Sequence, residues 1–412
     1  MRVSTAQFYL QSSQQMSSKT SDVNEQMAYL TSGKRVLTAK DDAVSFGTLA
    51  GYKDDLANIE KYKRNINQAE SHNSLQEVAF SNAEDILNNI KEQMLQANNG
   101  AMSSEDLQAL AKQTRNNLDQ LLDLANSQNE NGDYIFSGYQ TEQQPFSQQT
   151  DGSVSYSGDS GIRELQIAKN IKIPTNQTGD AAFMKVDNAI GDFSVDYPPN
   201  ATFPSANASG VAIESANIVD RGAYNTSTGP HTFTTDPLTN NLTVTDGGGI
   251  PVFPLFPAIP APHVAGQTVS FDGIEVTLSG NPLPGESFTI NEKADISIFD
   301  TINDAITWLE QGSVSTNTEQ HQVDYNAILD QLNTSTSHIT SRRVDAGVRL
   351  QVLENQESRH LDSELSITTG KANIEDLDFA KAISQFEQSK IALQASQQAF
   401  SKVQGLTLFN YI

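Results

Sequence analysis

Apolar residues recur at alternating spacings of four and three along both ends of this chain, whereas the middle has short runs of alternating apolar and polar residues. A 4-3 spacing places one narrow apolar stripe along a helix, as in coiled coils. Short alternating runs between turn residues are typical of β-strands. The pattern therefore predicts long helices at both ends and a β-rich segment between them.

The distribution of proline supports the same division. All 14 prolines lie between Pro145 and Pro284, so residues 1–144 and 285–412 contain none. Because proline in a helix interior costs about 3 kcal/mol, the two flanks permit very long helices. We expect an α+β fold in which long antiparallel coiled-coil helices from both chain ends form a rod. A β-rich domain is inserted in the middle.

The outermost helices have weak apolar stripes, because Ser13, Thr20, Lys390 and Gln397 interrupt their 4-3 spacing. Ordering a residue costs about 1–2 kcal/mol of backbone entropy, which such a stripe does not offset alone. We expect residues 1–40 and 371–412 to be terminal helices that are disordered in the monomer and pair on assembly. The predicted assembly seam consists of Tyr9, Met16, Val23, Met27, Leu30, Phe379, Ile383, Phe386, Leu393 and Phe400.

Residues 41–140 and 295–370 are expected to form the helical rod domain. Thr38 and Asp41 have the spacing of a capping box, which predicts a helix beginning there and continuing to Asn99. Such a helix would be about 85 Å long at 1.5 Å per residue. Ser103 and Asp106 predict the cap of a third helix, antiparallel to the second.

The C-terminal flank predicts two further long helices. One extends from about residue 318 to 368, with Arg342 and Arg349 interrupting its apolar stripe. Gly370 is expected to mark a break, and Ile374 is expected to begin the final helix.

Residues 141–294 are expected to form the inserted β-rich domain. Residues 231–235 and 241–245 have the composition of strands, and Asp272-Gly273 predicts a hairpin turn. Residues 251–262 contain five prolines and are expected to form an extended loop. Acidic residues outnumber basic ones in this segment, as is typical of an exposed surface domain.

Charge and composition exclude several classes of function. A net charge of -24 repels phosphate backbones, so we expect no nucleic-acid binding. The absence of cysteine excludes disulfides and thiolate chemistry. No apolar run is long enough to insert into a membrane, and the N-terminus lacks the apolar core of a cleavable signal peptide.

Candidate chemistry is also lacking. The six histidines never lie three to five residues apart, so no pair on one helix can bind a metal. No nucleophile, base and orienting group form a recognisable set. We therefore expect no catalytic residues, no cofactor and no metal, and we interpret the chain as a structural protein.

Two motifs in the proline-free flanks resemble those of the bacterial flagellin family. The first comprises residues 30–36, with Gly33 and Arg35, followed by residues 39–43, with Asp41 and Asp42. The second begins with Ile374, Glu375 and Asp376. Residues 132–139, 145–146, 156–159 and 404–411 are similar to the branch of this family at the junction between hook and filament, and differ from flagellin itself.

This resemblance implies a structural adaptor of the bacterial flagellum, located outside the cell. Its implied partners are other copies of itself in a ring, the first hook-associated protein, flagellin, and the flagellar export chaperone with the type III export apparatus. One alternative is flagellin, the filament subunit. Another is a surface binding protein or enzyme that acts through residues 141–294.

Overall fold

A computed structural model describes residues 5–100, 102–199, 207–224, 229–254, 261–312 and 318–405. Its contacts divide the chain into two compact units, residues 66–353 and residues 1–65 with 354–412. Helices α2 (Ala43–Ala97) and α5 (Thr318–Glu375) contribute to both units. We call residues 1–65 with 354–412 the terminal unit and residues 66–353 the central unit.

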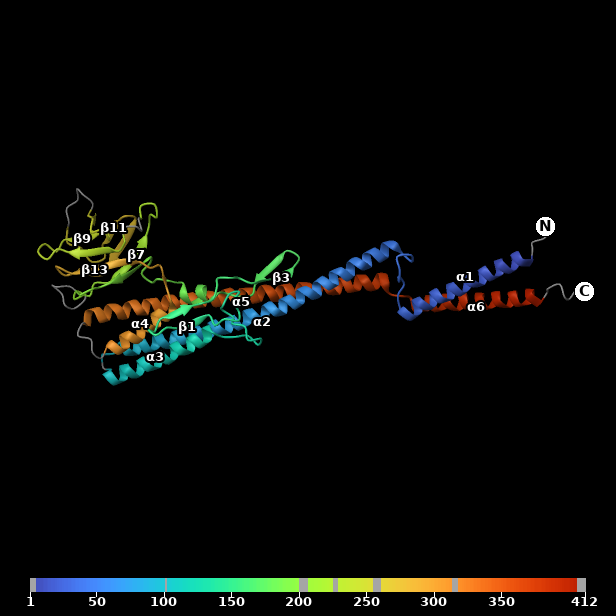
Figure 1. The fold of residues 1–412 in the computed structure, drawn as a ribbon, viewed down its shortest axis with the longest axis horizontal. Helices are drawn as coiled ribbons and strands as arrows, with labels where there is room; N and C mark the ends of the chain where they lie inside the picture. Colours follow the sequence, from blue (N-terminus) through green and yellow to red (C-terminus); the bar gives the residue numbers. More distant parts are fainter. Residues whose placement is uncertain are drawn as a thin grey trace, which may run out of the picture. The chain divides into compact units, whose positions relative to one another are not determined.

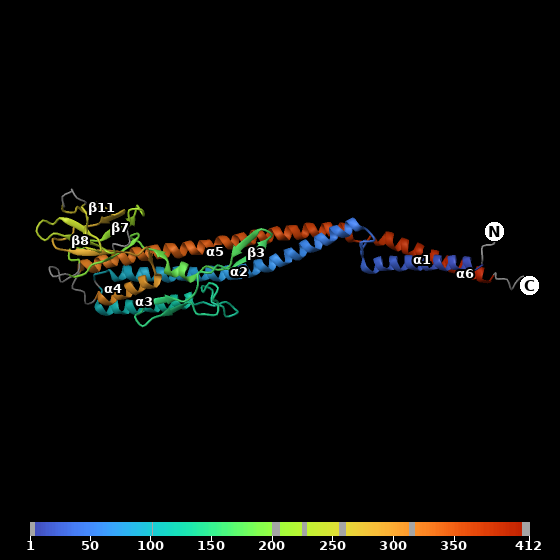
Figure 2. The same ribbon diagram turned by 45° about the horizontal axis from the view of Figure 1, so that its top comes forward.

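The terminal unit pairs the two ends of the chain. Helices α1 (Thr5–Ser32) and α6 (Phe379–Gly405) lie side by side in both views (Figures 1 and 2). Tyr9 contacts Phe400 at a ring-centroid distance of 5.8 Å, whereas Gly33 lies against Phe379. Since the start of α1 meets the end of α6, the pair is antiparallel, and the expected helical ends are confirmed.

Two predicted helix boundaries in this unit are wrong. Helix α5 continues through Gly370 to Glu375, and α6 begins at Phe379 rather than Ile374. A Cβ built at Gly370 would lie 3.1 Å from the Tyr52 hydroxyl oxygen. The glycine therefore lets α2 approach α5 closely and does not end the helix.

The helices of the central unit enclose its main hydrophobic core. Helices α3 (Ser104–Ala125) and α4 (Ile298–Gln311) contact each other and pack with α2 and α5 (Figure 1). Ser103 and Asp106 form the predicted capping box of α3. The side of α3 with 4-3 spacing is buried throughout, at Leu107, Ala111, Thr114, Leu118, Leu121 and Ala125.

The first part of the insert packs on these helices. It contains strands β1 (Phe146–Gln148) and β2 (Val154–Tyr156), the hairpin β3 (Glu164–Ala168) and β4 (Ile171–Pro174), and a short π-helix η1 (Asp180–Met184). Phe146 and Phe183 belong to the main helical core. The β3–β4 hairpin instead covers a second cluster that includes Ile66 and Leu353.

The rest of the insert, residues 188–294, forms a compact β domain that we call the knob. Strands β5 (Val186–Asp187) and β14 (Asp295–Ile296) pair at its base. One sheet has the order β10-β9-β8-β13-β6 and the other β11-β12-β7. The strands are β6 (Phe193–Asp196), β7 (Ile213–Ile218), β8 (His231–Thr235), β9 (Leu242–Thr245), β10 (Pro251–Phe253), β11 (Thr268–Phe271), β12 (Ile274–Leu278) and β13 (Ser287–Glu292).

The two sheets of the knob contact each other at both edges, through β6 with β7 and β10 with β11. They enclose a single apolar cluster that contains Phe233, Val276 and Phe288. The predicted hairpin is confirmed, because β11 and β12 pair around Asp272 and Gly273, both with positive φ. The extended loop predicted over residues 251–262 is wrong at its start, because residues 251–253 form β10 and pair with β9; residues 255–260 lie outside the described structure.

Candidate assembly site

The two flank motifs meet directly in the terminal unit. Lys34 and Asp376 form an antiparallel β-bridge, and the Arg35 backbone N–H donates to the Glu375 carbonyl at 2.7 Å. The Arg35 guanidinium donates to the Ile374 carbonyl oxygen from Nε at 3.2 Å and from Nη2 at 3.1 Å. We call this contact between residues 33–37 and 374–377 the motif junction. It joins the end of α1 to the start of α6.

Gly33 permits the turn from which the motif junction begins. Its φ of +68° lies in the left-handed region, where glycine has no Cβ to clash. The Leu377 backbone N–H donates to the Gly33 carbonyl at 3.1 Å. The Phe379 ring lies 3.5 Å from the position a Cβ of Gly33 would take. The positive φ therefore favours glycine here, whereas a Cβ would make only an ordinary contact with Phe379.

Glu375 provides the main charged contact of the motif junction. Its side chain is only 7% exposed, and its carboxylate accepts from Lys34 Nζ at 2.6 Å, with Lys371 Nζ at 3.6 Å. The hydrogen bond from Lys34 holds the pKa of Glu375 below its ordinary value, against the opposing effect of burial. A carboxylate in this position therefore stabilises the pairing of the two motifs while it is ionised.

Asp41 and Asp42 shape the entry to α2. The Asp41 carboxylate accepts the backbone N–H groups of Leu37 and Thr38 at 2.9 and 2.8 Å. Asp42 caps the helix, accepting the N–H groups of Val44 and Ser45, each at 3.1 Å. Backbone donation by Thr38 lowers the pKa of Asp41, and hydrogen bonding by Ser45 lowers the pKa of Asp42. The predicted capping box of Thr38 and Asp41 is wrong, because Asp42 is the N-cap.

The contact face between α1 and α6 contains most of the predicted assembly seam. Its partly buried members are Tyr9, Met16, Val23, Leu30, Phe386, Leu393 and Phe400. Between them on α6 lie Ala382, Ser389 and Ser396, which sequence reasoning missed. Small residues at alternate 4-3 positions let two helices approach closely, and this spacing was the available signal.

The remaining members of the predicted seam point away from that face. Met27, Phe379 and Ile383 are 55%, 53% and 52% exposed. Leu10 and Ile391 are also exposed apolar residues of α1 and α6, at 63% and 61%. The paired terminal helices thus retain apolar side chains outside the face that they share. Scattered exposed apolar residues are ordinary, so these exposures show only that the shared face does not cover all the apolar side chains of the two helices.

The motifs at residues 132–139 and 156–159 also converge. The Tyr156 hydroxyl donates to the backbone carbonyls of Phe136 and Asp159 at 3.0 and 2.9 Å. A Cβ on Gly138 would overlap Asp159. Residues 132–139 and 156–159 are therefore two sides of one packed turn. Their role in the structure is to fix the insert to the helices.

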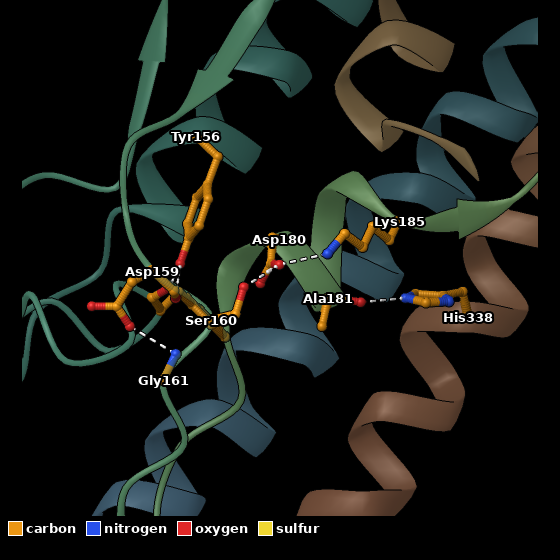
Figure 3. A network of polar contacts seen from close by, with 9 residues as sticks. Tyr156, Asp159, Ser160, Gly161, Asp180, Ala181, Lys185 and His338 are labelled. Atoms are coloured by element: carbon orange, nitrogen blue, oxygen red, sulfur yellow. Dashed lines mark hydrogen bonds and ion pairs between the residues drawn. The ribbon is translucent and has the colours of Figure 1, made fainter. Parts of the chain in front are cut away.

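The π-helix η1 anchors this turn to α5. Asp180 Oδ2 accepts from Ser160 Oγ at 2.9 Å and from Lys185 Nζ at 2.8 Å, and His338 Nε2 lies 2.9 Å from the Ala181 carbonyl oxygen (Figure 3). Burial opposes ionisation of Asp180, yet hydrogen bonds from Lys185, Thr178 and Ser160 lower its pKa to about 2. The carboxylate therefore acts as a charged structural anchor.

Gln76 is another structural residue that sequence reasoning missed. It is 1% exposed, donates to the carbonyls of Ile135 and Gln177, and accepts the Gln177 N–H at 2.9 Å. A lone glutamine in a helix gives no sequence signal for this role, because its backbone partners lie far along the chain.

The described residues contain no group of three or more histidine, aspartate or glutamate side chains arranged to hold a metal ion. Among the helices of the described ranges, none is long and apolar enough to cross a membrane.

Comparison with known proteins agrees with this geometry. Residues 3–141 match the family "Bacterial flagellin N-terminal helical region", and residues 328–412 match "Bacterial flagellin C-terminal helical region". The chain belongs to the bacterial flagellin family. The motif junction connects these two matched regions, because residues 33–37 lie in the first and residues 374–377 lie in the second.

Three relatives show which branch of the flagellin family the chain resembles. Flagellar hook-associated protein 3 of Escherichia coli (strain K12) is 22% identical over 409 residues, covering 99% of each chain. Its namesake from Salmonella typhimurium (strain LT2) is 24% identical over 413 residues, again covering 99% of each. The crystal structure of the flagellar junction protein FlgL from Legionella pneumophila, 29% identical, has a TM-score of 0.66 and covers 80% of this chain and 100% of that one.

Proposed function

We propose that this chain is a structural adaptor of the bacterial flagellum that joins the hook-associated ring to the flagellin filament. The observation that carries the proposal is its similarity, along nearly the whole chain, to two proteins named flagellar hook-associated protein 3. The FlgL structure supports it, because that protein is also described as a junction protein and shares the fold.

The proposed partners are neighbouring copies in a ring, the first hook-associated protein on one side and flagellin on the other. Before assembly, the chain is carried by the flagellar export chaperone to the type III export apparatus and leaves the cell through it. It then acts outside the cell, without catalysis. A chain free of cysteine and rich in long helices suits export in an unfolded state.

Assembly uses the terminal unit. Residues 1–40 and 371–412 become ordered when α1 and α6 of the same copy pair. The partly buried contact face then lies between these two helices. The exposed part of the seam, with Met27, Phe379 and Ile383, contacts neighbouring molecules. Under this proposal, one set of apolar residues packs between α1 and α6 and the other set packs against neighbouring copies. The two helices therefore have more apolar residues than their own pairing buries.

Deletion of the gene tests this function. We expect mutant cells to keep their hooks, release flagellin into the medium and lose motility, and we expect the full chain to restore attached filaments. Mutant cells that still carry full-length filaments would contradict the adaptor role. If the purified chain polymerises alone into long filaments, it is instead a filament subunit.

A further inference from the structure

Tyr139 is an exposed aromatic residue that the structure nevertheless holds in place. It is 64% exposed, its hydroxyl donates to the Ile162 carbonyl at 2.8 Å, and its backbone N–H donates to Asp159 Oδ1 at 2.9 Å. With the hydroxyl and the backbone both fixed, the ring keeps one orientation. A side chain ordered in advance loses little entropy when it binds a partner.

The neighbouring loop is fixed by the same carboxylate. Asp159 Oδ1 also accepts the Gly161 backbone N–H at 2.7 Å (Figure 3). A Cβ at Gly161 would overlap the Tyr139 ring, so the ring lies directly on this glycine. Ile162, which follows, is 53% exposed. Tyr139 and Ile162 together form a preorganised apolar surface of the central unit, which we call the aromatic edge.

The groups around the aromatic edge include more acidic than basic side chains, although Arg163, which follows Ile162, lies close enough to Asp159 to interact with it. Asp159 lies beneath the aromatic edge, and Glu142 and Glu164 are exposed within three residues of Tyr139 and Ile162 along the chain. Lys172 lies 3.5 Å from Glu164, an exposed pair of little strength. Tyrosine anchors in partly desolvated contacts carry much of the energy of protein interfaces. A partner should therefore offer an apolar pocket with a basic rim.

The terminal unit contains such a pocket. Val36 and Leu49 are 4% and 2% exposed and lie at its inner part, with Leu37 and Phe46 also among its lining residues. Lys34 and Lys53 are its cationic members. Its one carboxylate, Glu375, is already engaged by Lys34 and Lys371, so the exposed Lys53 leaves a positive surplus.

We propose that the aromatic edge of one copy docks into this pocket of a second copy. The proposal rests on the ring of copies in the proposed function and names the contact between neighbours. Apolar groups meet apolar walls, and the acidic surroundings of Tyr139 meet the basic rim. Because the two surfaces differ, the contact is head-to-tail, and one copy can bind a neighbour on each side.

The absence of natural cysteine makes the contact measurable. Gln140→Cys and Ala50→Cys place thiols beside the anchor and in the pocket without removing Tyr139. The double variant replaces the native protein in cells, and intact flagella are treated with a mild oxidant. Non-reducing gels of the tagged chain should show a ladder of dimers and larger oligomers, with the two cysteine peptides joined in mass spectra. Each single-cysteine variant should remain monomeric.

Adding Tyr139→Ala to the double variant should abolish the ladder, whereas Val264→Ala, at an exposed knob residue, should leave it intact. Antibody labelling locates the protein in the same cells. Label at the filament base with no ladder, or with a ladder that Tyr139→Ala does not change, would overturn the docking contact and leave the adaptor function standing. A ladder that stops at dimers would contradict the head-to-tail arrangement. Absence of label from the filament base would overturn both proposals.

Discussion

At the residue scale, the motif junction explains why the flank motifs contain their particular residues. Gly33 supplies a left-handed turn, Arg35 satisfies the Ile374 carbonyl at the end of α5, and Glu375 binds Lys34. The sequence suggested these positions only by resemblance. Their contacts could not be derived from it, because they join residues more than 300 positions apart through backbone groups that carry no sequence signal.

Glu375→Gln should weaken the assembled state at neutral pH, since hydrogen bonds to charged groups contribute about 1.5–3 kcal/mol. The folded pKa of Glu375 is lowered from 4.5, so its stabilising contribution is complete above about pH 4.5 and is lost as the pH falls through the lower folded value. The measurement is the fraction of antibody-labelled protein that stays attached to cells as the pH is lowered in steps. The Glu375→Gln variant should show a lower retained fraction at neutral pH. It should also lack the further loss that protonation of Glu375 causes in the wild type.

Glu387→Gln is the matched control, because Glu387 forms an exposed pair with Lys390 on α6 at 3.2 Å. Such surface pairs contribute about 0–1 kcal/mol. Equal retention of the wild type and Glu375→Gln across the acid range would show that the buried carboxylate is not a stabilising contact.

At the element scale, the long helices and their division from the strands follow directly from sequence periodicity and proline placement. The register of the terminal pair does not. A 4-3 repeat through Tyr9, Met16 and Val23 can continue at Ser13 and Thr20 or at Ser12 and Lys19, and the structure uses the latter. Apolar periodicity identifies every apolar side of a helix, and only the partner helix decides which side is buried within the chain.

Leu393→Ala should prevent assembly of the protein between hook and filament, while leaving the melting temperature of the monomer unchanged. Complete burial of a leucine makes its truncation cost about 2–5 kcal/mol, and the partial burial of Leu393 gives a smaller value. Calorimetry of the monomer and labelling of cells check the two parts. Ile391→Ala, at a 61% exposed position of the same helix, tests the outward side separately. A lower monomer melting temperature for Leu393→Ala would show that the pair is already folded.

The terminal segments themselves should be digested first by protease in the dilute monomer. The contact face between α1 and α6 contains Lys19, Ser389 and Ser396, which bury little apolar area to offset the entropy lost on ordering. Mass spectrometry of limited digests should therefore show cuts within residues 1–40 and 371–412 before any in the central unit. Simultaneous digestion of both parts would contradict the expected order.

At the scale of the whole molecule, the structure locates a natural boundary that composition did not give. The first part of the β-rich insert contributes Phe146 and Phe183 to the helical core, whereas the knob has its own core. The β5–β14 pair brings the two ends of the knob together, with the Asn188 N–H donating to the Ala294 carbonyl at 2.8 Å. Prolines occur in both parts of the insert, so the sequence does not distinguish the first part from the knob. Only the packing of the structure separates them.

Replacing residues 188–294 by a two-residue hairpin turn should leave secretion, filament attachment and swimming largely intact. The pair at the base already has hairpin geometry, and the motif junction and the aromatic edge lie outside the deletion. Soft-agar motility and electron microscopy measure the outcome. Replacing residues 186–268 serves as the contrasting control, because it removes both partners of β13 and leaves β12 paired only with β11, and should destabilise the protein. A stably exported 188–294 replacement whose cells shed all their filaments would place the essential contact in the knob.

Immunogold labelling of the chain on intact cells tests the adaptor role most directly. We expect a single band of label between the hook and the base of each filament, with none along the filament. Label distributed along the whole filament would identify a filament subunit, and label over the cell surface would contradict a flagellar junction altogether.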